Sequence, residues 1–127
     1  MSFSNFLELE VLDHVFRNSA YTAPSTIYVA LFTSAPNDAG GGTEVSGNGY
    51  ARQSMAFGTA SSGSISNSSS VEFPTATGDQ GTIVAMGLFD ASSGGNLLAY
   101  GSLTSNKTVS NGDVFRFNAS SVTISLD

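Results

Sequence analysis

The sequence predicts an all-β protein, an antiparallel, jelly-roll-like β-sandwich of about eight short strands with one N-terminal α-helix. Three observations lead to this fold class. Short runs of β-branched and aromatic residues recur about every dozen residues. Turn-forming residues separate the runs, and 14 of the 127 residues are Gly. No intervening segment has room for the crossover helix that a parallel sheet requires.

The helix is expected over residues 4–17, with Ser4 as its N-cap and Asn18 leaving it in a left-handed conformation. Its apolar residues recur at helical spacing and form one stripe, made of Leu7, Val11, Leu12, Val15 and Phe16. Such a stripe either packs against the edge of the sheet or docks on a neighbouring subunit. Both alternatives are open at the level of the sequence.

After Pro24 the pattern changes to the period of two that is typical of strands. The expected strands are 26–33, 50–57, 71–73, 82–90, 96–103, one ending at 109, 114–117 and 122–126. The strands 26–33 and 82–90 are apolar on both faces, as buried strands are. The last two are expected to pair as a C-terminal hairpin. The Gly/Ser-rich residues 58–70 are expected to form a mobile loop around a weak strand, within a single domain spanning 1–127.

The charge of the chain argues against two classes of partner. Four Lys and Arg residues stand against ten Asp and Glu, and the net charge is −6. Nucleic acids and anionic membrane surfaces both need clustered cations, so neither is an expected partner. No apolar run has the length of a membrane span, and Met1–Asn5 lacks the basic start of a signal peptide, so we expect synthesis and folding in the cytoplasm.

The sequence also contains no grouping that predicts catalysis. His14 is the only histidine, and no Gly-x-Ser-x-Gly motif accompanies it. Four aspartates lie within two residues of Gly, Asn or Ser, where carboxylates usually bond to turn amides: Asp38, Asp79, Asp90 and Asp113. One loop offers oxygen ligands at Asn37, Asp38 and Glu44, at a spacing that matches no EF-hand. There is no Cys, and we expect no enzyme, cofactor or metal site.

Several longer motifs resemble a family of small tailed-bacteriophage proteins of tail-fibre-like type. The motifs are Asp13-His14-Val15-Phe16, 20–24 (AYTAP), 28–31 (YVAL), 49–52 (GYAR), 73–78 (FPTATG), 87–98 (GLFDASSGGNLL) and 122–127 (VTISLD). The resemblance spans nearly the whole chain, and residues 53–68 match only loosely. It implies a structural protein of the phage virion, without catalytic residues.

The leading hypothesis is therefore a virion surface protein of tail-fibre or tail-tip type that self-associates, with a homotrimer and other virion proteins as its partners. The helix and the following turn are the expected assembly interface, through Leu7, Val11, His14, Val15, Phe16 and Tyr21. One alternative is a capsid decoration protein of the same fold. Another is a module that binds host surface glycan through exposed tyrosines.

Overall fold

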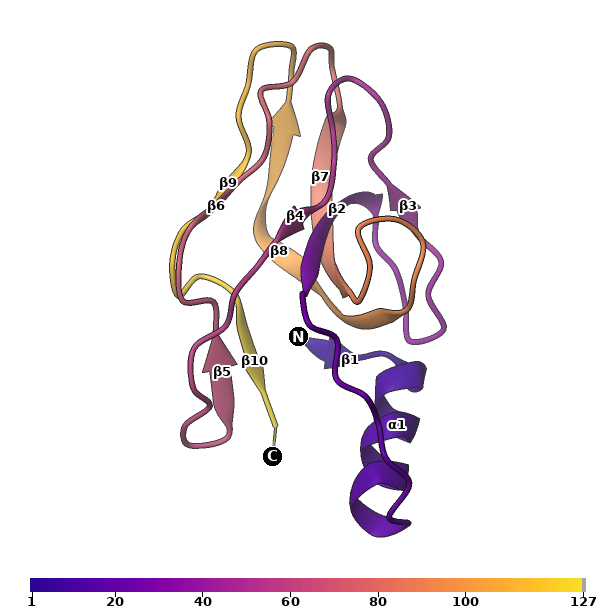
Figure 1. Ribbon diagram of the computed structural model, residues 1–127. Helices are drawn as coiled ribbons and strands as arrows, with labels where there is room; N and C mark the ends of the chain where they lie inside the picture. The colour runs from indigo at the N-terminus through magenta and orange to yellow at the C-terminus, as the bar shows by residue number, and fades with distance from the viewer. Residues whose placement is uncertain (127) are drawn as a thin grey trace.

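The computed structural model describes residues 1–126 and shows the predicted β-sandwich with one N-terminal helix (Figure 1). Asp127, the last residue of the expected domain and of the final motif, lies outside the described residues. The first layer is a six-stranded antiparallel sheet in the order β1-β8-β7-β2-β3, with β4 also pairing with β2. Its strands are β1 (Ser2–Phe3), β2 (Tyr28–Ser34), β3 (Thr43–Glu44), β4 (Gln53–Ser54), β7 (Gly81–Phe89) and β8 (Leu97–Val109).

The second layer consists of two short antiparallel ladders that face this sheet, at the left of Figure 1. One ladder joins β5 (Ser64–Ser66) to β10 (Thr123–Ser125), and the other joins β6 (Val71–Glu72) to β9 (Arg116–Phe117). The weak strand expected within residues 58–70 is therefore present as β5. It is stabilised by a partner that lies some sixty residues later in the chain.

The main hydrophobic core lies between the two layers. The sheet contributes Leu31 and Ile83, both fully buried. The second layer contributes an aromatic group in which Phe115 lies edge-on to Phe73 and Phe117, with ring centroids 5.8 and 5.0 Å away. Such edge-to-face contacts are favourable because the positive ring edge meets the negative ring face.

The strand β2 is buried on both faces, as its sequence predicts. Val29 and Leu31 face the main core, whereas Ala30 and Phe32 join a smaller cluster on the opposite face of the sheet. This alternation follows from the pleat, which points successive side chains to opposite faces. Both faces of the central strands are therefore used for packing.

The helix α1 (Asn5–Phe16) begins and ends as predicted. The backbone N–H of Leu7 donates to Ser4 Oγ at 3.2 Å, and the Ser4 hydroxyl donates to the Leu97 carbonyl of β8. Ser4 therefore caps the helix and also ties it to the main sheet. At the other end Asn18 adopts a φ of 54°, the left-handed conformation that ends the helix.

The predicted C-terminal hairpin is wrong. The strand β9 pairs with β6 and β10 pairs with β5, so the last two strands belong to different ladders. The strand expected to end at Val109 is also not separate, because β8 runs without interruption from Leu97 to Val109. In contrast, the expected strand 50–57 shortens to Gln53–Ser54. Local alternation predicts a strand but carries no information about its partner.

Candidate functional site

Helix α1 presents an apolar surface that the rest of the described chain does not cover. Figure 1 shows α1 projecting from the lower end of the sandwich. We define the helix stripe as Leu9, Leu12, Val15 and Phe16, whose exposed fractions are 63, 53, 60 and 79%. Soluble monomers expose single apolar residues routinely, but contiguous apolar patches usually mark an interaction site.

Three of the four stripe residues, Leu9, Leu12 and Phe16, lie on the side of α1 that faces away from the sandwich, and Val15 lies at the edge of this side. Leu9, Leu12 and Phe16 follow the spacing i, i+3, i+7, which aligns side chains along one face of a helix. Leu7 precedes Phe16 by nine residues, or about two and a half helical turns, so the two point in opposite directions. Leu7 and Val11 are partly buried, whereas Val15 and Phe16 are exposed. The structure thus divides the predicted interface residues between two faces of the helix.

The two remaining predicted interface residues, His14 and Tyr21, hold the chain where it turns back along α1. The Tyr21 backbone N–H donates to His14 Nδ1 at 3.1 Å. The Tyr21 ring lies edge-on to Phe6, with centroids 6.3 Å apart. Burial, together with the negative charges of Asp90 and Glu10, raises the pKa of the Tyr21 hydroxyl. Residues of the first two motifs therefore contact each other and hold the chain that follows α1 against the helix.

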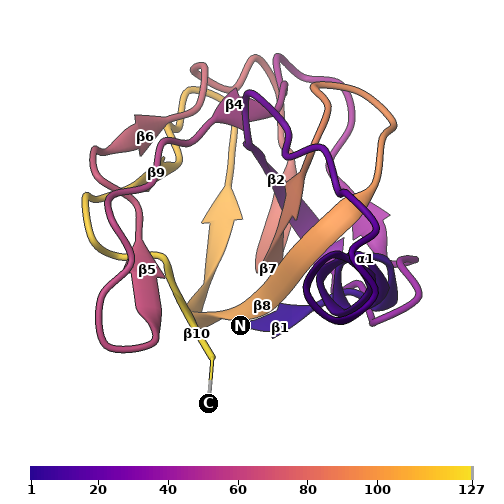
Figure 2. The ribbon, with the colours of Figure 1, turned by 60° about the horizontal axis from the view of Figure 1, so that its bottom comes forward.

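An open apolar groove of about 320 Å³ lies on the inner side of α1, between the helix and the β5–β10 ladder. We define the apolar groove by those of its large lining side chains that are not fully buried, Phe3, Leu7, Ile27, Phe57, Ile65, Ile124 and Leu126. Figure 2 looks onto this end of the molecule, where α1 and the β5–β10 ladder lie on either side of β1. Leu126, with 59% of its surface exposed, contributes to the rim.

The residues of two further motifs meet around Arg52, a site that the sequence did not reveal. The Arg52 guanidinium binds both carboxylate oxygens of Glu44, at 2.9 and 2.8 Å, and its side chain is only 8% exposed. It also donates to the carbonyls of Ala91 and Gly94, both at 2.9 Å. The guanidinium carbon lies 3.7 Å from the centroid of the Phe89 ring, a cation–π contact. One side chain therefore joins β3, β7 and the loop that follows β7.

The electrostatics of this cluster follow from its burial. Burial raises the pKa of the Glu44 carboxyl, but the hydrogen bonds from Arg52 and Tyr50 outweigh it, and the net pKa is lowered. The Tyr50 hydroxyl donates to Glu44 Oε2 at 2.6 Å and accepts from the Leu31 N–H. Burial and the bond to Glu44 raise the Tyr50 pKa well above its usual value. The cluster is thus a charged structural link with no free nucleophile or base.

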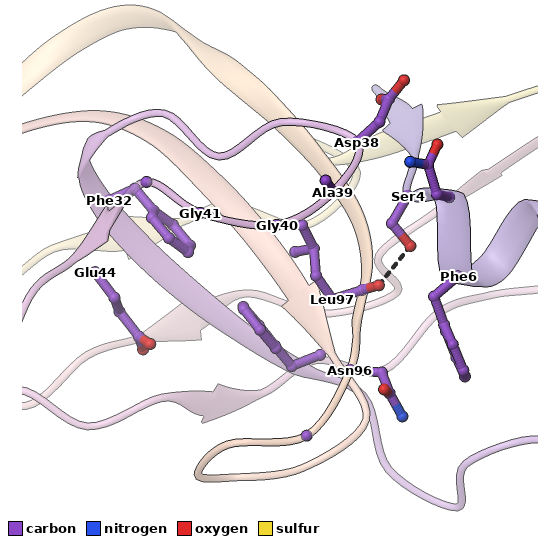
Figure 3. Close-up of a pocket in the computed structure, with 14 residues that line it drawn as sticks. Ser4, Phe6, Phe32, Asp38, Ala39, Gly40, Gly41, Glu44, Asn96 and Leu97 are labelled. Atoms are coloured by element: carbon purple, nitrogen blue, oxygen red, sulfur yellow. Dashed lines mark hydrogen bonds between the residues drawn. The ribbon is translucent and has the colours of Figure 1, made fainter.

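A second pocket, of about 460 Å³, opens near the start of α1 and is shown in Figure 3. Phe32 and Phe6 contribute aromatic surface, and Asn96 and Asp38 contribute polar groups. The figure shows Asp38 and Glu44 at opposite ends of this pocket. The pocket therefore combines aromatic and polar surface without a pair of facing carboxylates.

The four aspartates that were expected in turns all accept hydrogen bonds, and Asp79 accepts from the Asn111 N–H, 32 residues away. Asp90 accepts from the Asn96 backbone and Asp113 accepts from the Ser110 backbone, which confirms turn roles for both. Asp38 differs, because it accepts from the Tyr100 hydroxyl, and Asn37 makes the turn bond to the Ala39 N–H instead. Within residues 1–126 no group of three or more His, Asp or Glu side chains converges.

Comparison with known protein families decides the identity of the chain. A family model described as podophage GP4 fiber I protein gp80 matches residues 2–125. The chain belongs to this phage fibre family. No curated protein matches it. The expected resemblance to tail-fibre-like virion proteins is thus confirmed, and a role as a phage structural component follows from the fibre family. Among residues 1–126 the structure contains no helix long and apolar enough to cross a bilayer.

Two features of the fibre protein were missed in the sequence. The Arg52 cluster is one, and its signal was a lone Arg two residues after Tyr50 in a chain with only four Lys and Arg residues. Leu9 is the other, because the apolar residues were assigned to a single stripe through Leu7. The fold buries one side of the helix and leaves the other exposed, so the two sides must be considered separately.

Proposed function

We propose that this chain is a non-enzymatic structural subunit of a phage fibre that self-associates, as a homotrimer, within the virion. The observation that supports the proposal is the helix stripe, which projects from the sandwich and has no partner in its own chain. Membership of the fibre family agrees with self-association, because a fibre is assembled from repeated subunits. Other virion proteins are the expected neighbours of the trimer.

The energetics favour burial of the helix stripe in an assembly. Fully burying a Val, Leu or Phe side chain stabilises a protein by about 1.5–3 kcal/mol. The four stripe side chains are each more than half exposed, so an interface that covered them all would gain roughly 4 kcal/mol. The rest of the exposed surface is poor in charge, with only 11% charged residues in the chain, which lowers the desolvation cost of close packing.

The proposal is tested by the mass of the protein in solution. Light scattering after size exclusion is expected to give a trimer for the unchanged chain and a monomer for the double variant Leu12→Ser, Phe16→Ser. The matched control is Val114→Ser, since Val114 is also an exposed apolar residue, at 45%, in the segment between β8 and β9. A monomeric parent protein at high micromolar concentration contradicts self-association.

The choice between a fibre and a capsid decoration protein depends on copy number. We propose the fibre because the family is described as a fibre protein. Quantitative mass spectrometry of purified virions is expected to give tens of copies or fewer per particle. Hundreds of copies would favour the decoration protein instead.

A second candidate function, binding of host glycan, is favoured by the pocket of Figure 3. Aromatic faces beside amide and carboxylate groups are the surfaces that sugars bind, and the pocket offers Phe6 and Phe32 near Asn96 and Asp38. A glycan array probed with the chain tests this function. Binding that is lost on Asn96→Ala would support it, and an array without signal would eliminate it.

A further inference from the structure

Two apolar surfaces lie at the same end of the molecule and remain without a partner. One is the helix stripe on the outer side of α1, and the other is the apolar groove on its inner side. The strands β1 and β10, near the two ends of the described chain, also lie toward this end of the fold, as Figures 1 and 2 show. The two surfaces are complementary in form, because the stripe projects and the groove is hollow.

The helix stripe cannot fill the groove of its own chain. Leu7 forms part of the groove wall, and Phe16 points in the opposite direction from the same helix. The first turn of α1 is fixed to the sheet, because Ser4 bonds to Leu97 and the Asn5 N–H donates to the Asp38 carbonyl at 2.8 Å. A rotation of the helix that brought the stripe inward would break these contacts. The stripe can therefore occupy such a groove only in another chain.

We propose that the helix stripe of one copy docks into the apolar groove of a second copy, head to tail, and that successive contacts of this kind close the ring of the trimer. This inference rests on the proposed function of the chain as a self-associating fibre subunit. The occupant of the groove is thus a second copy of the same chain, bound through Leu9, Leu12 and Phe16.

The spacing and volume of the two surfaces fit this contact. Helices that dock into apolar grooves do so through residues at i, i+3 and i+7, as in the helix stripe. A two-turn segment of a helix about 10 Å wide displaces on the order of 800 Å³. The groove, at about 320 Å³, is smaller than that and has room for protruding side chains rather than for a whole helix. The stripe supplies such side chains.

The area favours a ring over a simple helix-to-helix contact. At roughly 100 Å² for each half-exposed apolar side chain, the helix stripe offers on the order of 400 Å². Stable interfaces bury about 800 Å² per partner, so stripe-to-stripe packing falls short. In a head-to-tail ring every copy uses both its stripe and its groove, which doubles the area that each copy buries. Heterologous contacts of this kind form rings when the rotation closes.

The absence of cysteine from the sequence makes site-directed crosslinking a clean test. The variant Val15→Cys places a thiol at the edge of the helix stripe, and Ala60→Cys places one at the groove, which Ala60 lines. The two purified full-length variants are mixed in equal amounts, allowed to exchange subunits and treated with a short bismaleimide crosslinker. Val114→Cys, in the segment between β8 and β9, replaces Ala60→Cys in the control mixture.

The proposal expects a crosslinked heterodimer of Val15→Cys with Ala60→Cys, at least about tenfold above the control mixture, because docking raises the effective concentration of the paired thiols. The double variant Val15→Cys, Ala60→Cys is expected to give a ladder that ends at the trimer. A crosslink confined to pairs of Val15→Cys chains would overturn docking in the groove while leaving self-association intact. A double variant that crosslinks only within the monomer would also overturn it. No crosslink in any mixture, with a monomeric mass by light scattering, would overturn both this inference and the proposed self-association.

Discussion

Replacing Arg52 by Ala is expected to cause the largest loss of stability among the charged positions of this protein. The substitution removes the paired hydrogen bonds to Glu44, the two bonds to the loop carbonyls of Ala91 and Gly94, and the contact with the Phe89 ring. It leaves the Glu44 carboxylate, whose side chain is only 26% exposed, without its positive partner. The loop after β7 loses its attachment to β3 at the same time.

The magnitude follows from the burial of the pair. Removing one partner of a buried ion pair costs about 3–5 kcal/mol, because the remaining charge stays buried and unpaired. Glu44 is partly solvated and keeps its bond from Tyr50, which places the expected loss at about 3 kcal/mol. A domain of this size has a free energy of unfolding of about 5–15 kcal/mol, so the loss is a substantial fraction. Arg52→Lys is expected to lose about 2 kcal/mol, since an ammonium cannot bind both carboxylate oxygens and both carbonyls.

Urea unfolding followed by far-ultraviolet circular dichroism measures this loss. The matched control is Arg17→Ala, which breaks the exposed pair of Arg17 with Asp13 and is expected to cost less than about 1 kcal/mol. The double variant Arg52→Met, Glu44→Gln is expected to recover part of the stability, because it removes both charges together. An Arg52→Ala variant that loses no more stability than Arg17→Ala would refute the structural role of the cluster.

Three further predictions concern the same scaffold. Ser4→Ala is expected to cost about 2 kcal/mol in urea unfolding, because it removes both the helix cap and the hydroxyl's bond to the buried Leu97 carbonyl; Ser4→Thr, which keeps a hydroxyl, is the control. Asn67→Ala is expected to lower the free energy of unfolding by about 3 kcal/mol, since the buried Asn67 side chain makes three hydrogen bonds. The control is Asn106→Ala at an exposed position, and a smaller loss for Asn67→Ala than for this control would contradict the role of Asn67. The pKa of Glu44 is lower in the folded protein than in the unfolded chain, where it is about 4.3. The ionised carboxylate therefore contributes its full share of the free energy of unfolding above that value, and this share is lost as the pH falls through the pKa of the folded state. When the pH is lowered from about 6 to 3, the free energy of unfolding is therefore expected to fall less in the Glu44→Gln variant than in the parent protein. An equal fall in both proteins would disprove the contribution of Glu44.

The fold class and the helix could be predicted because their signals are local. The N-cap at Ser4, the left-handed Asn18 and the apolar spacing of α1 all lie within a few residues of the structure they specify. The double-sided burial of β2 was likewise predictable, because a continuous apolar run needs packing on both faces.

The predictions that failed concern partners that are distant in the sequence. Asn67 lies in the Gly/Ser-rich segment that was expected to form a mobile loop around a weak strand; the strand is present as β5, but the burial of Asn67 beside it, at 1% exposed, was not predicted. Its side chain accepts from the Val122 N–H and donates to the carbonyls of Ser69 and Asn118. Two of these partners lie more than fifty residues away, so the composition of the segment gives no indication that the Asn is buried. The pairing of β10 with β5 rather than with β9 has the same cause.

The sequence by itself therefore determined the all-β class, the N-terminal helix and, through its motifs, the phage fibre family. Only the tertiary structure decided which strands pair, why Arg52 is buried, and which side of α1 is left exposed. Periodicity identifies the apolar residues of a helix, but the contacts of the folded chain determine which of them are covered. Here they partly cover Leu7 and leave Leu9, Leu12 and Phe16 exposed, because Ser4 fixes the rotation of the helix against β8.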